Sequence, residues 1–110
     1  MSIRYQVEIE GSGFHIPMSD AEPLVGFLTE RRVIASDGDA AKSRAVEVLR
    51  AEPKVQRLLD ETAKATGGST LCALSATRVR EISWWHWYFR GYMKGFAFWS
   101  DDINKYESGS

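Results

Sequence analysis

This chain of 110 residues has few of the side chains that build metal centres or cross-links: one cysteine, Cys72, and two histidines, His15 and His86. A single cysteine excludes an internal disulfide and a zinc site built on paired cysteines, and it is typical of proteins from a reducing compartment. The two histidines lie far apart in the sequence, and no acidic residue stands beside them at a metal-ligand spacing. The sequence therefore predicts no metal and no other cofactor.

The chain also lacks an excess of charge of either sign and any long apolar run. Its 14 Lys and Arg against 15 Asp and Glu give a net charge of −1, which provides no overall field to attract a polyanion or an anionic membrane. No stretch approaches the roughly 18 apolar residues that span a bilayer. Residues 1–11 alternate polar and apolar side chains instead of forming the apolar core of a signal peptide. We expect a cytoplasmic protein with no membrane partner.

What the chain does have is the composition of one globular domain, with 44% hydrophobic and 26% charged residues. A chain of this mass buries roughly two thirds of its accessible surface on folding, which suits one core. We therefore predict a single domain over residues 1–106. Residues 107–110 are polar, and we expect them to form a disordered tail.

Apolar and polar side chains alternate at the start of the chain, and the apolar residues of one parity are Ile3, Tyr5, Val7 and Ile9. This two-residue period predicts a half-buried antiparallel strand over residues 3–10. β-branched and aromatic residues predict three more strands, at residues 24–35, 70–82 and 95–99. Gly26 indicates a bulge in the second strand.

Two helices are predicted between the second and third strands, one from Asp39 to before Pro53 and one from Pro53 to Gly67. A single kinked helix is the alternative. Ser36 or Asp37 can cap the first helix. The side chains expected to face inward recur at helical spacing: Ala41, Ala45, Val48 and Leu49 in the first helix, and Val55, Leu58, Leu59 and Ala63 in the second.

The order of elements limits the fold. Strand, strand, helix, helix, strand, strand leaves connections too short for several parallel crossovers. An antiparallel sheet of about four strands with the helices on one face satisfies this order. The predicted fold is therefore α+β, a two-layer sandwich.

Aromatic residues are concentrated in residues 82–99, which hold nine of the thirteen in the chain: Trp84, Trp85, Trp87, Tyr88, Phe89, Tyr92, Phe96, Phe98 and Trp99. Each large aromatic side chain removes about 150–250 Å² from water when buried, so the segment can anchor the core of so small a domain. Consecutive aromatic residues, however, point to all sides of a strand or helix, and one face cannot bury them all. We therefore expect some of them to be exposed.

Exposed aromatic side chains beside basic residues have the composition of protein interfaces, where Trp, Tyr and Arg are enriched. Our leading hypothesis is a non-enzymatic binding or assembly domain that uses residues 84–99 to bind a protein partner or a second copy of itself. A homodimer is the expected assembly. The residues expected to bind are Trp84, Trp85, His86, Trp87, Tyr88, Arg90 and Tyr92.

Two alternatives use the same segment. One is a protein that binds a small molecule, or a minor enzyme, in which His86 exchanges protons near neutral pH. The pocket of that protein would be lined by Trp84, Trp87, Arg90 and Tyr92. The other is a single-stranded nucleic-acid binder that stacks bases on the rings and holds phosphates with Arg78, Arg80, Arg90 and Lys94. Nucleic acid is disfavoured because nearby acidic residues reduce the positive charge: Glu81, Asp101 and Asp102.

No residue is predicted to be catalytic. Cys72 lies within a predicted strand among apolar residues, where buried and inert thiols are common. Acid pairs such as Asp37 and Asp39 are explained as helix caps and turn residues. Four arginines of the predicted strands, Arg31, Arg32, Arg78 and Arg80, are expected to pair across the sheet, with an anion as the alternative partner. Their expected carboxylate partners are Glu8, Glu10 and Glu30.

The middle of the chain, residues 26–53, reads GFLTERRVIASDGDAAKSRAVEVLRAEP. It resembles small uncharacterised bacterial proteins of the α+β class, in which an aromatic strand with a basic residue leads into an alanine-rich helix. The resemblance covers about a quarter of the chain and involves structural positions. It implies the fold described above and brings no assigned activity to any residue.

Overall fold

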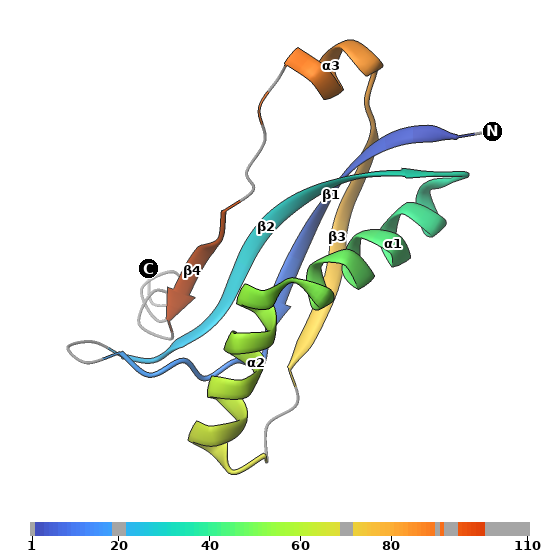
Figure 1. The fold of residues 1–110 in the computed structure, drawn as a ribbon. Helices are drawn as coiled ribbons and strands as arrows, with labels where there is room; N and C mark the ends of the chain where they lie inside the picture. The colour runs from blue at the N-terminus through green and yellow to red at the C-terminus, as the bar shows by residue number, and fades with distance from the viewer. Residues whose placement is uncertain (1, 19–21, 69–71, 90, 92–94, 101–110) are drawn as a thin grey trace, which may run out of the picture.

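The structure, a computed structural model, describes residues 2–18, 22–68, 72–89, 91 and 95–100. Four antiparallel strands form one sheet in the order β3-β1-β2-β4: β1 (Ile3–Ser12), β2 (Leu24–Ala35), β3 (Ala73–Glu81) and β4 (Ala97–Ser100). Two helices, α1 (Gly38–Ala51) and α2 (Pro53–Thr66), lie together on one side of the sheet (Figure 1). The predicted α+β sandwich is confirmed.

β1 lies between β2 and β3 in the sheet, and the alternation of its side chains explains why only one of its faces packs against the helices. Its odd-numbered residues Tyr5, Val7 and Ile9 are buried on the side of the helices, and the odd-numbered residues of β2 are their partners across the ladder. The even-numbered residues of both strands lie on the opposite face, which we call the open face. β3 joins the other side of β1 with a register shift that leaves Thr77 opposite no residue of β1.

The helix boundaries follow local capping. The Asp37 side chain accepts a hydrogen bond from the backbone N–H of Ala40 at 2.8 Å, so Asp37 and not Ser36 caps α1. Glu52 has an extended backbone with ψ of 138°, which makes α1 and α2 two helices instead of one kinked helix. α2 ends at Gly67, whose φ of 67° lies in the left-handed region that glycine adopts without strain.

The buried faces of the helices correct two of the predicted inward positions. Val48 is 47% exposed, and Ala63 is also exposed, whereas Thr62 is fully buried. The Thr62 hydroxyl accepts a hydrogen bond from the backbone N–H of His15 at 3.0 Å. α2 therefore turns Thr62 toward the loop that follows β1, and this rotation carries Ala63 to the surface.

A partly buried ion pair joins the helical layer to the sheet. The guanidinium of Arg31 in β2 donates two hydrogen bonds to the carboxylate of Glu52, from Nε at 2.7 Å and from Nη2 at 2.8 Å. Its Nη1 donates to the Thr29 hydroxyl at 2.7 Å and to the backbone carbonyl of Glu30 at 2.6 Å. The Arg31 side chain is 10% exposed and that of Glu52 30% exposed, so water screens this pair only in part.

The predicted cross-strand partners of Arg31 are therefore wrong. Arg31 is the ladder partner of Val7, and this parity places its side chain under the helices. Glu8, Glu10 and Glu30 have the other parity and lie on the open face. The carboxylate of Glu52, at the junction of α1 and α2, reaches Arg31 instead, because the helices lie on the same side of the sheet as the Arg31 side chain (Figure 1).

The Arg31–Glu52 pair predicts the effect of a conservative substitution. Lysine keeps the charge but cannot donate the paired bonds that the planar guanidinium makes. We expect Arg31→Lys to lower the free energy of unfolding by about 2 kcal/mol, since several buried acceptors lose their donor. Urea denaturation, monitored by circular dichroism, measures this change in the free energy of unfolding. Arg57→Lys, at an exposed position of α2, is the control and should change stability by less than about 0.5 kcal/mol.

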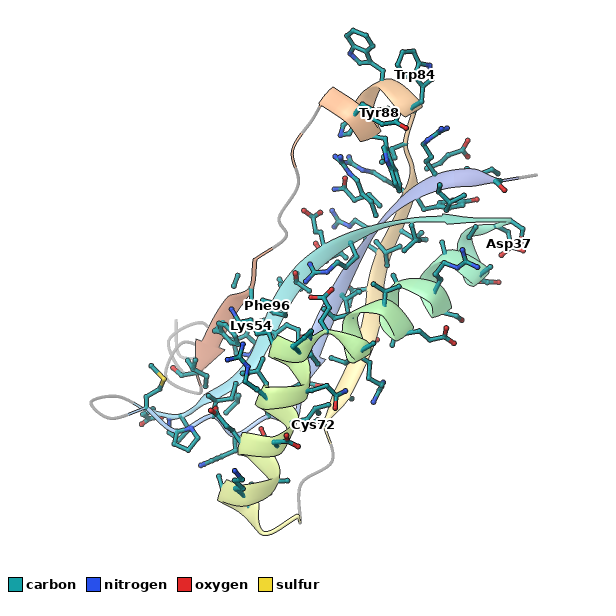
Figure 2. All side chains as sticks on the ribbon, in the orientation of Figure 1. Asp37, Lys54, Cys72, Trp84, Tyr88 and Phe96 are labelled. Carbon is teal, nitrogen blue, oxygen red and sulfur yellow. The ribbon has the colours of Figure 1, made fainter. Side chains whose placement is uncertain are left out.

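β4 closes the edge of the sheet through aromatic packing. Phe27 of β2 contacts the rings of Phe96 and Phe98, with centroids 5.0 and 5.8 Å away. Lys54 of α2 lies over the same two rings, its Nζ 4.7 Å from the Phe96 centroid and 5.6 Å from that of Phe98 (Figure 2). The pairing of β2 with β4 shifts register between Leu24 and Gly26, as the predicted bulge requires.

Close packing at Gly26 yields a second stability prediction. A Cβ atom there would lie 2.5 Å from Cζ2 of Trp99 and 2.7 Å from the backbone carbonyl oxygen of Gly11. The Gly11 backbone belongs to β1 in the middle of the sheet and cannot easily move away from a new Cβ atom. Gly26→Ala should therefore destabilise the fold by about 2 kcal/mol. Thermal unfolding checks this. Gly91→Ala, where a Cβ would meet nothing within 4 Å, should leave the midpoint unchanged.

Candidate functional site

The candidate site begins with a short helix that the sequence analysis did not predict, α3 (Trp84–Phe89). The side chain of Ser83 accepts a hydrogen bond from the backbone N–H of His86 at 3.2 Å, and its carbonyl accepts one from the N–H of Trp87 at 3.0 Å. Serine immediately before an apolar run is a helix-start signal. It was the one local sign of this helix in the sequence.

α3 presents three aromatic side chains to solvent, Trp84, Trp85 and Tyr88, which we call the α3 aromatic surface. They are 55%, 57% and 67% exposed. The Trp84 ring lies edge-on to Trp85, with centroids 5.7 Å apart, and is inclined to Tyr88 at 6.4 Å. Trp84 projects from α3 away from the sheet (Figure 2). The three rings therefore form one contiguous exposed patch.

The backbone of α3 is held against the open face by Arg32. The Arg32 guanidinium donates to the carbonyls of Trp87 at 2.9 Å and Gly91 at 3.3 Å, and also to the side-chain oxygen of Gln6 at 3.1 Å. On the side nearer β3, the N–H of buried Ile82 donates to the Arg4 carbonyl at 2.8 Å. None of these bonds is made by the ring of Trp84, Trp85 or Tyr88, so they position the helix without occupying the α3 aromatic surface.

The structure divides the aromatic segment into two parts with different environments. Of the predicted binding residues, Trp84, Trp85 and Tyr88 are exposed, and His86 and Trp87 are half-buried. Arg90 and Tyr92 lie outside the described residues. At the other end of the segment, Phe96 and Phe98 pack against the core. The expectation that only some of these aromatic residues are exposed is thus confirmed.

Other candidate chemistry is sparse in the described part of the chain. Trp84, His86 and Trp87 line none of four hollows found in this part of the chain. The ligand pocket expected at the aromatic segment therefore stays a prediction. Within the same residues, no group of three or more His, Cys, Asp or Glu side chains is placed to hold a metal ion. None of the described helices is both long and apolar enough to cross a membrane.

Cys72 is half-buried, with its sulfur 3.5 Å from the carbonyl oxygen of Gly13. Burial raises the pKa of the Cys72 thiol, and a side-chain hydrogen bond with Thr62 opposes this rise in part. Because the thiolate is the reactive form, a raised pKa reduces reactivity near neutral pH.

We therefore expect Cys72 to react with a disulfide reagent such as Ellman's reagent more slowly at pH 8 than glutathione does. The same chain unfolded in urea is the control, and there the rate should rise to that of a free thiol because both the burial and the pKa shift are lost. A faster reaction in the folded protein would mean that Cys72 has an activated thiolate.

Comparisons of this chain with protein-family models, with curated proteins and with solved structures find no match.

Proposed function

We propose that the protein is a binding and assembly domain whose α3 aromatic surface pairs with the same surface of a second copy. The observation that carries the proposal is the exposure of three adjacent rings, Trp84, Trp85 and Tyr88, each by more than half. Exposed apolar patches of a few hundred Å² on soluble domains are often functional. Trp and Tyr are also the residues that dominate binding energies at interfaces.

The size of the patch determines how strong the pairing can be. Three rings of this exposure present roughly 300 Å² per copy, given the area of an aromatic side chain. Burying that area on both copies contributes on the order of 15 kcal/mol at about 25 cal/mol per Å². Association itself costs about 4–15 kcal/mol. The balance supports a reversible dimer in which the rings form the centre and neighbouring polar residues form the rim.

Three features favour a second copy as the partner. A net charge of −1 produces little repulsion between copies. In a dimer with a two-fold axis, the α3 aromatic surface of each copy contacts the same surface of the other copy. Within one copy, the rings of Trp84 and Trp85 already pack edge to face. The sheet edge at β3 is a poorer seam, because the bulge at Thr77 and the charges of Arg78, Arg80 and Glu81 disrupt a regular added strand. The single cysteine supports a cytoplasmic setting for this dimer.

Sedimentation across a hundredfold range of concentration tests this proposal. We expect the native chain to pass from monomer to dimer in the micromolar range, and the double variant Trp84→Ser, Tyr88→Ser to weaken pairing at least tenfold. Each lost ring removes buried apolar area that only the dimer provides. Val48→Ser removes an exposed side chain of similar accessibility from α1 and should leave the dimer unchanged.

Acrylamide quenching of tryptophan fluorescence separates the other outcomes. Tryptophans that are quenched when dilute and protected when concentrated support the dimer. A monomer whose tryptophans are quenched at every concentration would overturn self-association in favour of a different partner. If the double variant loses its native circular dichroism spectrum, the rings are needed for folding and the proposal fails.

A further inference from the structure

The chain between β3 and β4, residues 82–96, joins the two opposite edges of the sheet, because the strand order is β3-β1-β2-β4. We call it the crossing segment, and it carries α3 (Figure 1). Its described residues are attached to the sheet at both ends. At the start, the backbone N–H of Ile82 donates to the Arg4 carbonyl at 2.8 Å. At the end, the Gly95 carbonyl accepts from the Thr29 hydroxyl at 2.7 Å, so α3 lies between two fixed points.

Arg32 of β2 attaches the middle of the crossing segment to the open face of the sheet. Its guanidinium donates from Nη1 to the carbonyl of Trp87 at 2.9 Å, and from Nη2 to the carbonyl of Gly91 at 3.3 Å. Trp87 lies in the last turn of α3, and Gly91 lies just past its end. One guanidinium therefore holds both the end of α3 and the backbone that leaves it.

α3 is too short to keep its shape without attachments of this kind. It has six residues, whereas isolated helices shorter than about 12–15 residues are marginal in water. The last four carbonyls of a helix find no donor within it, and the Trp87 carbonyl is one of these in α3. A positive charge near a helix C-terminus is also favourable for the helix dipole. Arg32 supplies both the donor and the charge from the neighbouring sheet.

The orientation of the Arg32 guanidinium is set from the sheet side by Gln6, its ladder partner in β1. The Nε of Arg32 donates to the side-chain oxygen of Gln6 at 3.1 Å. Gln6 is only 7% exposed, and its nitrogen donates to the Glu30 carboxylate at 3.0 Å. Each of the three guanidinium nitrogens thus has its own acceptor, which the single nitrogen of lysine cannot reproduce. The donor that holds α3 is therefore itself held in place.

We propose that Arg32 is the positioning residue of the α3 aromatic surface, which it holds in the arrangement that pairs with a second copy. This inference rests on the self-pairing proposed above. Arg32 is half-buried, and it acts on the three rings through the backbone of α3. Without its bonds, α3 would have to be ordered as the copies associate, and that ordering would weaken the dimer. Because each copy carries one Arg32, the loss counts twice in a homodimer.

Sedimentation of Arg32→Gln across the same range of concentration tests the proposal. We expect the dissociation constant of the dimer to rise at least about tenfold, since α3 is no longer preorganised. Arg32→Lys should lie between Arg32→Gln and the native chain, because an ammonium group cannot make the paired bonds of the guanidinium. Arg44→Gln is the matched control. Arg44 of α1 also donates to a backbone carbonyl, that of Ile34 at 3.0 Å, and its replacement should leave pairing unchanged.

A second measurement follows the position of α3 without relying on pairing. It uses the Trp84→Ser, Tyr88→Ser variant, in which the rings that pair are gone, and the ¹⁵N order parameter of the Trp87 amide. We expect about 0.85, the value of a rigid backbone, while Arg32 is present, and less than about 0.6 after Arg32→Gln is added. The Val7 amide of β1 is the control and should stay near about 0.85 in both proteins.

The two measurements separate the role of Arg32 from the self-pairing on which it rests. A native chain that stays monomeric at every concentration would overturn both. If the native chain pairs and Arg32→Gln pairs equally well, or if Arg32→Gln leaves the Trp87 order parameter unchanged, only the positioning role is wrong. Loss of the native circular dichroism spectrum in Arg32→Gln would show that Arg32 is needed for folding, and this too would overturn the positioning role.

Discussion

The ion pair between Arg31 and Glu52 is the interaction on which the arrangement of the two layers depends. Glu52 is the single residue between α1 and α2, so fixing its carboxylate fixes the position at which the helical layer bends. The same guanidinium holds Thr29 beside it, and the Thr29 hydroxyl donates to the carbonyl of Gly95 at 2.7 Å. One buried cation therefore joins β2, the helix junction and the approach to β4.

Much of this fold can be predicted from local sequence because local rules decide it. The parity of Tyr5, Val7 and Ile9 is enough to predict a strand with one buried face, and a capping aspartate and a terminal glycine indicate where the helices begin and end. The partner of Arg31 could not be predicted in this way. It lies 21 residues away in sequence, and the choice among carboxylates depends on which face of the sheet the helices cover.

The candidate site shows the same division. Sequence alone indicates that residues 84–89 cannot all be buried, since neighbouring side chains point in different directions. Which of them are exposed depends on where the chain leaves the sheet after Ile82 and where it returns at β4. Phe96 and Phe98 meet Phe27 at that return, while Trp84 and Tyr88 project from the opposite end of the connection (Figure 2). The register shift at Thr77, whose hydroxyl donates to the Glu8 carboxylate at 2.9 Å, likewise follows from pairing with β1 and has no signature in the sequence of β3.

The division of the aromatic segment also bears on how this chain can change during evolution. Phe96 and Phe98 fill space between β2 and α2, so purifying selection for folding alone would maintain them in any descendant. Trp84 and Tyr88 are more than half exposed and are not among the core residues of the described part of the chain. Selection for folding therefore constrains them less, and drift can replace them with polar residues unless selection acts on what they bind. Their persistence in diverged sequences, measured against that of Val48, would therefore separate selection for binding from selection for stability.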